Sequence, residues 1–152
     1  MEQENKYYTP DISELHIGYE CQIGNLFALP GSRWEWAETK PLKWSTIAFI
    51  AQAMIPEHLV YIRTKYLDQS DIESCGWKHT GGQLVSHGRQ DYEKAGMMLK
   101  HFPRHHSLFI AKAINPDAMD GFAEKLFDGE CKSINELRLI MKFLKITEDG
   151  KS

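Results

Sequence analysis

The sequence predicts one α+β domain over residues 1–152, in which a mostly antiparallel sheet of about four to six strands packs against a C-terminal amphipathic helix and one further helix. Three observations predict this class. Apolar residues alternate near the start, β-branched and aromatic runs separated by turn formers follow, and apolar residues at helical spacing fill the end of the chain. A length of 152 residues fits one ordinary domain with a substantial core.

The first predicted strand spans residues 15–23, where apolar and polar residues alternate. A period of two places one set of side chains on a single face of a half-buried strand. That set is Leu15, Ile17, Tyr19, Cys21 and Ile23.

Residues 24–44 form an irregular arm that is rich in turn formers and tryptophan. Trp34, Trp36 and Trp44 lie in or at the end of this arm. Large aromatic side chains are usually core or cover, so we expect the arm to pack over the sheet. The alternative is that it forms an exposed recognition surface.

Local signals predict the middle elements. Residues 45–55 have helical spacing between a capping Ser45 and Pro56, and residues 59–66 are β-branched and aromatic as in a strand. Ser70-Asp71-Ile72-Glu73 fits a capping box, which predicts a short helix over 70–75 closed by Gly76.

Three strands are expected in the second half of the chain. Residues 77–91 read as a loop or a hairpin with a wide turn, and a strand follows over 92–102. Its partner is predicted over 107–114, and a further short strand over 126–131.

The closing helix has the clearest signals. Ser133-Ile134-Asn135-Glu136 is a capping box, and lysines lie near the other end of the helix, where its dipole is negative. We expect residues 146–152 to fray. One apolar stripe follows the cap, at Ile134, Leu137, Ile140, Met141 and Leu144.

Composition excludes several classes of protein. A net charge of −3 and a pI of about 6.2 argue against a protein that coats nucleic acid. No apolar run approaches the ~18 residues of a membrane span, and the polar start Met1–Lys6 lacks the features of a signal peptide. Three scattered cysteines fit reduced thiols, so we expect a cytoplasmic protein.

The sequence carries no complete catalytic or metal-binding pattern, and we expect no cofactor. No Cys-x-x-Cys or His-Glu-x-x-His occurs. His105-His106-Ser107-Leu108 resembles half of the signature of the two-histidine phosphoesterases, in which one histidine is the base and the other the acid. A small phosphodiesterase or nuclease that uses His105 and a second histidine is therefore an alternative function.

A binding surface is the favoured functional prediction. Aromatic and arginine side chains are enriched at protein interfaces. A basic and aromatic mixture also suits single-stranded nucleic acid, but the overall acidity favours a protein partner. The predicted contact residues are Arg33, Trp34, Trp36, Trp44 and Trp77.

Three stretches resemble a group of small uncharacterised proteins encoded by phages and prophages of Bacteroidetes bacteria: YTPDISELHIGYE at 8–20, IRTKYLD with DIESCGW at 62–77, and LFDGECKSINEL at 126–137. The resemblance implies a phage or mobile-element protein in a bacterial cytoplasm and assigns no catalytic residue. It favours an interaction protein that inhibits a host defence or replication factor. A phage structural or assembly subunit is a further alternative.

Overall fold

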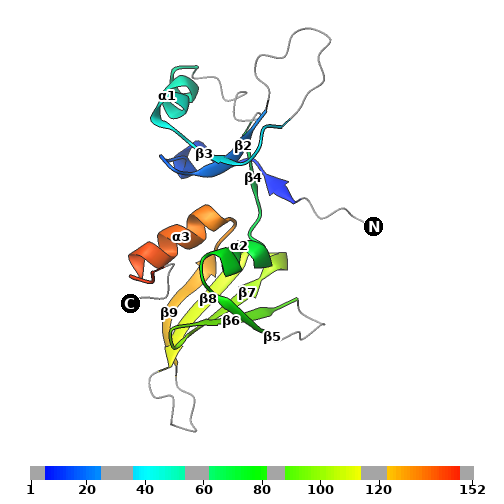
Figure 1. Ribbon diagram of the computed structural model, residues 1–152, viewed down its shortest axis with the longest axis vertical. Helices are drawn as coiled ribbons and strands as arrows, with labels where there is room; N and C mark the ends of the chain where they lie inside the picture. The colour runs from blue at the N-terminus through cyan, green and yellow to red at the C-terminus, as the bar shows by residue number, and fades with distance from the viewer. Residues whose placement is uncertain (1–5, 25–35, 54–61, 82–87, 114–122, 148–152) are drawn as a thin grey trace. The chain divides into compact units, whose positions relative to one another are not determined.

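The computed structural model describes residues 6–24, 36–53, 62–81, 88–113 and 123–147. The chain divides into two compact units, residues 1–66 and residues 67–152, which we call the N-terminal and C-terminal units. Each unit has its own antiparallel sheet and its own apolar core (Figure 1). The predicted α+β class and C-terminal helix are confirmed, but the strands form two sheets instead of one.

The N-terminal unit contains a four-stranded sheet with the order β1-β4-β2-β3. Every adjacent pair of strands is antiparallel. Its elements are β1 (Tyr7–Tyr8), the 3-10 helix η1 (Ile12–Glu14), β2 (Glu20–Ile23), β3 (Lys40–Pro41), α1 (Trp44–Ala53) and β4 (Ile62–Lys65). The predicted helix over 45–55 is confirmed as α1, and β4 lies within the strand predicted over 59–66.

The strand predicted over 15–23 is shorter than the alternation indicated. A turn at Gly18, whose φ is +87°, precedes β2, and the Tyr19 amide donates to the His16 carbonyl at 3.0 Å. Glycine adopts positive φ without steric cost, so the chain bends here and only the later residues extend. Ile17, predicted to face the core, is 66% exposed as a result.

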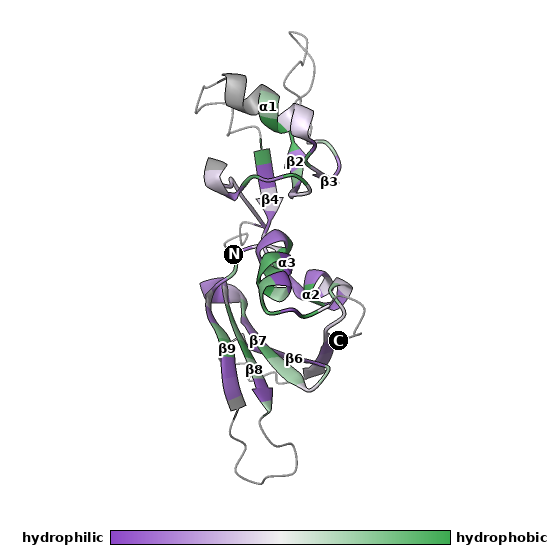
Figure 2. Cartoon of the chain, turned by 90° about the vertical axis from the view of Figure 1, so that its left-hand side faces the viewer, coloured by the Kyte–Doolittle hydropathy of each residue, from purple (hydrophilic) through white to green (hydrophobic). Residues whose placement is uncertain are grey.

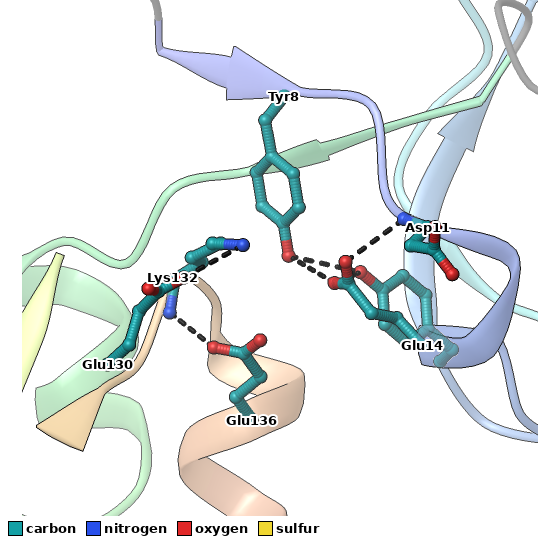
Figure 3. Close-up of polar contacts among 7 residues, drawn as sticks. Tyr8, Asp11, Glu14, Glu130, Lys132 and Glu136 are labelled. Carbon is teal, nitrogen blue, oxygen red and sulfur yellow. Dashed lines mark hydrogen bonds and ion pairs between the residues drawn. The ribbon is translucent and has the colours of Figure 1, made fainter.

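The described residues of the N-terminal unit form a small apolar core. Tyr19, Cys21, Leu42 and Ile62 are buried together. A polar network lies beside them: the hydroxyl of Tyr8 donates to Glu14 Oε2 at 3.0 Å and lies 3.2 Å from the hydroxyl of Tyr19 (Figure 3). These bonds satisfy the phenol oxygens of the buried Tyr19 and the half-buried Tyr8.

The C-terminal unit is a five-stranded meander with the order β5-β6-β7-β8-β9. Two helices, α2 and α3, cover one face of this sheet (Figure 1). Its elements are α2 (Gln69–Ser74), β5 (Lys78–Gly81), β6 (Gln90–Lys94), β7 (Met97–Phe102), the 3-10 helix η3 (Pro103–His105), β8 (Ser107–Ala113), β9 (Ala123–Glu130) and α3 (Ile134–Phe143).

The core of the C-terminal unit lies between its helices and its sheet. Hydrophilic and hydrophobic residues both occur along α3, as in an amphipathic helix (Figure 2). The buried cluster is Leu67, Ile72, Cys75, Trp77, Tyr92, Leu99, Leu108, Ile110, Cys131, Leu137, Met141 and Ile146. Ile146, which was predicted to begin a frayed tail, packs in this cluster, and its amide donates to the Met141 carbonyl at 2.8 Å.

The strand predicted over 92–102 is a hairpin of β6 and β7. Ala95 and Gly96 join the two strands with φ values of +47° and +77°. Two successive residues with positive φ are typical of the type I′ turn, whose twist suits antiparallel strands. Alanine rarely takes this conformation, which is why the turn carries no strong sequence signal.

Both caps in the C-terminal unit differ in detail from the predicted capping boxes. For α2 the cap is Asp68, which accepts from the Asp71 amide at 3.0 Å and completes the box with the Asp71 side chain. For α3 the Ser133 hydroxyl makes no capping bond, while the Glu136 carboxylate accepts from the Lys132 amide (Figure 3). Each helix begins near its predicted residue with a different set of bonds.

Candidate protein-interaction surface

The guanidinium group of Arg63 is stacked on two aromatic rings in the N-terminal unit. Its central carbon lies 4.0 Å from the ring centroid of Tyr7 and 4.3 Å from that of Trp36. The Nε atom donates to Gln22 Oε1 at 2.8 Å. We call these four residues, Tyr7, Gln22, Trp36 and Arg63, the Arg63 clamp.

The register of the sheet assembles the Arg63 clamp. Arg63 is paired with Gln22 across β4 and β2, while β1 brings Tyr7 to the other side of β4. An isolated bridge between Gly24 and Trp36 extends the β2 side. Successive strand residues point to opposite faces, and Ile62 and Thr64 are buried, so the side chain of Arg63 lies on the face away from the core.

Trp44, the first residue of α1, is 68% exposed. An open, mainly apolar groove of about 250 Å³ lies on the sheet of the same unit, and its lining residues Lys43 and Thr46 flank Trp44 in the sequence. Its lining is Cys21, Ile23, Ala37, Glu38, Lys40, Pro41, Leu42, Lys43 and Thr46. Cys21 and Ile23 alternate with Gln22 along β2, so the groove and the Arg63 clamp use opposite faces of one sheet.

The predicted contact residues do not all belong to one unit. Trp36 and Trp44 belong to the N-terminal unit, while Arg33 and Trp34 lie outside the described residues. Trp77 belongs to the C-terminal unit, where it is 2% exposed and its Nε1 donates to Met141 Sδ at 3.4 Å. Trp77 is therefore a core residue and offers no surface to a partner.

Arg63 and Gln22 are the residues that the sequence did not single out. Arg63 interrupts a run of β-branched and aromatic residues, and a charged residue at alternating positions marks the solvent face of a strand. That signal identifies a solvent-facing arginine. It does not identify the rings of Tyr7 and Trp36, which reach Arg63 only through pairing over long stretches of sequence.

The histidines at 101, 105 and 106 differ in burial and backbone conformation. His105 is exposed in η3, and His106 takes a left-handed conformation directly after it. His101 is buried, with Nδ1 3.3 Å from Gln90 Oε1. Burial, with a smaller contribution from nearby His106, lowers the pKa of His101 to about 4, and Asp68 opposes the shift. Among the described residues, no hydrogen bond joins His105 to a second histidine.

Cys21, Cys75 and Cys131 are all buried, and none of them is in a disulfide. Burial raises the pKa of Cys21 to about 11, and burial followed by the nearby Glu136 carboxylate raises the pKa of Cys131. A nucleophilic cysteine needs a lowered pKa and access to substrate. Neither Cys21 nor Cys131 meets those conditions.

Within the described ranges, no group of three or more His, Cys, Asp and Glu side chains is arranged to hold a metal ion. No helix in those ranges is long and apolar enough to cross a membrane. Comparisons of the chain with protein-family models, with curated proteins and with solved structures found no match.

Proposed function

We propose that this protein is a non-enzymatic protein-interaction module and that Trp44, with the adjoining groove, forms its main contact surface. The observation that carries the proposal is the exposure of Trp44 beside an apolar groove on the same unit. Tryptophan is among the residues most enriched at the energetic centres of protein interfaces.

The energetics favour a partner that covers Trp44. With 68% of the residue exposed, removal of Trp44 from water would contribute roughly 3 kcal/mol at ~25 cal/mol per Å². The groove is lined by Cys21, Ile23, Pro41 and Leu42, which can receive an apolar side chain of the partner. Lys40, Lys43 and Glu38 at the same groove supply a polar rim.

The setting that we propose is a phage or mobile element in a bacterial cytoplasm, with a host defence or replication factor as the partner that is inhibited. This part rests on the resemblance of residues 8–20, 62–77 and 126–137 to small proteins of Bacteroidetes phages. A binding surface without catalytic groups suits inhibition by occupation of a partner's surface.

The test compares two exposed aromatic residues that lie in different units. The tagged chain, its Trp44→Ala variant and its Phe143→Ala variant are each used to capture proteins from a Bacteroidetes lysate, with quantification by mass spectrometry. Phe143 is the matched control because it is 89% exposed at the end of α3. We expect one partner to be retained by the wild type and by Phe143→Ala, and to be lost with Trp44→Ala.

Equal capture by all three chains, with circular dichroism confirming that each is folded, would show that Trp44 is not the anchor. Loss with Phe143→Ala alone would move the contact surface to α3. Large homo-oligomers in size-exclusion chromatography, with no foreign partner, would favour the phage assembly subunit.

A further inference from the structure

We propose that the Arg63 clamp is a receptor for a carboxylate group carried by an acidic segment of a protein partner. Only Nε of Arg63 is hydrogen-bonded within the described part of the chain, and its acceptor is Gln22. The two Nη groups remain as donors at the end of the side chain. Two parallel N–H groups of a guanidinium match the two oxygens of a carboxylate.

The clamp prepares Arg63 for this contact before a ligand arrives. Arginine normally loses much rotamer freedom when it is fixed in one geometry. Here Tyr7 and Trp36 hold the guanidinium plane and Gln22 fixes its Nε edge. A ligand therefore meets a group whose orientation is already set, which lowers the entropic cost of binding.

The surroundings of Arg63 favour a carboxylate over a nucleic-acid strand. Strand alternation places Lys65 and Glu20 on the same sheet face as Arg63, so the described strand residues of β2 and β4 give this face two cations and one carboxylate. A phosphate backbone is usually held by several cations along a track. Tyr7 and Trp36 also each direct one ring face at Arg63, which leaves less aromatic surface on which bases could stack.

This site is independent of the surface proposed around Trp44, because the groove and the clamp use opposite faces of the sheet. Failure of one proposal leaves the other intact. A partner that engaged both would contact the apolar groove and the cationic clamp, on two faces of one sheet.

The experiment uses the full chain labelled with ¹⁵N and a defined probe, a peptide of alternating serine and glutamate with blocked ends. We expect the peptide to shift the Arg63 Nε–H and Trp36 indole N–H resonances in a saturable manner. The same peptide with glutamine in place of glutamate should produce no shift. A single-stranded oligothymidylate is titrated in parallel.

Variants assign the effect to the clamp. Arg63→Lys keeps the charge but loses the planar fork, and Gln22→Leu releases Nε while it leaves the guanidinium in place. Each should weaken binding of the acidic peptide, with about a tenfold loss for Arg63→Lys. Arg89→Lys is the matched control, since Arg89 lies in the other unit and its Nη2 already donates to Asp91 Oδ2 at 3.0 Å.

Three results would overturn the proposal: no saturable shift with the acidic peptide, an equal shift with the glutamine peptide, or full binding by Arg63→Lys. Saturable shifts with the oligothymidylate alone would assign the clamp to nucleic acid instead. If Arg63→Lys does not fold, Gln22→Leu decides, and unchanged affinity in that folded variant counts against the clamp.

Discussion

The two units use their tryptophans in opposite ways. In the C-terminal unit Trp77 is buried among side chains from both helices and the sheet. In the N-terminal unit Trp44 is mostly exposed, and Trp36 covers the guanidinium of Arg63. Among the described residues, twelve buried side chains form the core of the C-terminal unit and four form that of the N-terminal unit. The comparison suggests that one unit provides stability and the other presents binding groups.

Removal of each tryptophan in turn tests this difference between the two units most directly. Trp77→Ala should lower the free energy of unfolding by about 3–5 kcal/mol, because it leaves a large cavity in a close-packed core. Trp44→Ala should change it by less than ~0.5 kcal/mol, since the side chain is largely in water. Urea denaturation followed by circular dichroism measures both values. Similar losses for the two variants would end the distinction between a core tryptophan and a surface tryptophan.

A second test uses the buried His101 of the C-terminal unit. Its pKa is about 4 in the folded chain and 6.5 ordinarily, so between these values the unfolded chain binds a proton that the native chain does not. Stability should therefore fall as the pH drops through this window, by about 3 kcal/mol in total. Urea midpoints measured from about pH 7 to about pH 4 report the loss, because this range spans both pKa values of His101.

Substitution of His101 tests whether this residue causes the pH dependence. His101→Gln should flatten it, because the amide side chain does not titrate. An undiminished pH dependence in folded His101→Gln would show that other groups carry it.

Elements with local signals could be predicted from the sequence. The helices α1, α2 and α3 follow from helical spacing and cap residues, and they begin within one residue of the predicted starts. Strand β8 follows from a mainly apolar run. The bonds at the caps were less predictable. Ser70 is inside α2, and its place as cap is taken by Asp68, which has the same capping chemistry two residues earlier.

What could not be predicted depends on pairing between distant residues. The division into two sheets follows from β1 and β2 pairing with β4, and no local pattern encodes that choice. The same holds for Arg63, whose partners Tyr7 and Trp36 come from elsewhere in the chain. Tryptophan is a residue type that is enriched at interfaces, and only the position of Trp77 under α3 shows that it belongs to the core.

The smallest predicted effect concerns how independently the two units open. Cys21 is buried in the N-terminal unit, whereas Cys75 and Cys131 are buried in the C-terminal unit. A buried thiol reacts with iodoacetamide only when the structure around it opens, and smaller cores open at a lower free energy. We expect Cys21 to be alkylated about tenfold faster than the other two, a difference of ~1.4 kcal/mol.

Peptide mass mapping after timed alkylation in dilute urea assigns each rate, and the Cys21→Ser variant removes the fast phase as a control. Trp77→Ala should raise the rates at Cys75 and Cys131, which share its core, while the rate at Cys21 stays the same. If all three cysteines react together, the chain opens as one cooperative unit. Arg63 and Trp44 would then depend on the C-terminal core for their stability, and a substitution as remote as Trp77→Ala would weaken binding at both proposed surfaces.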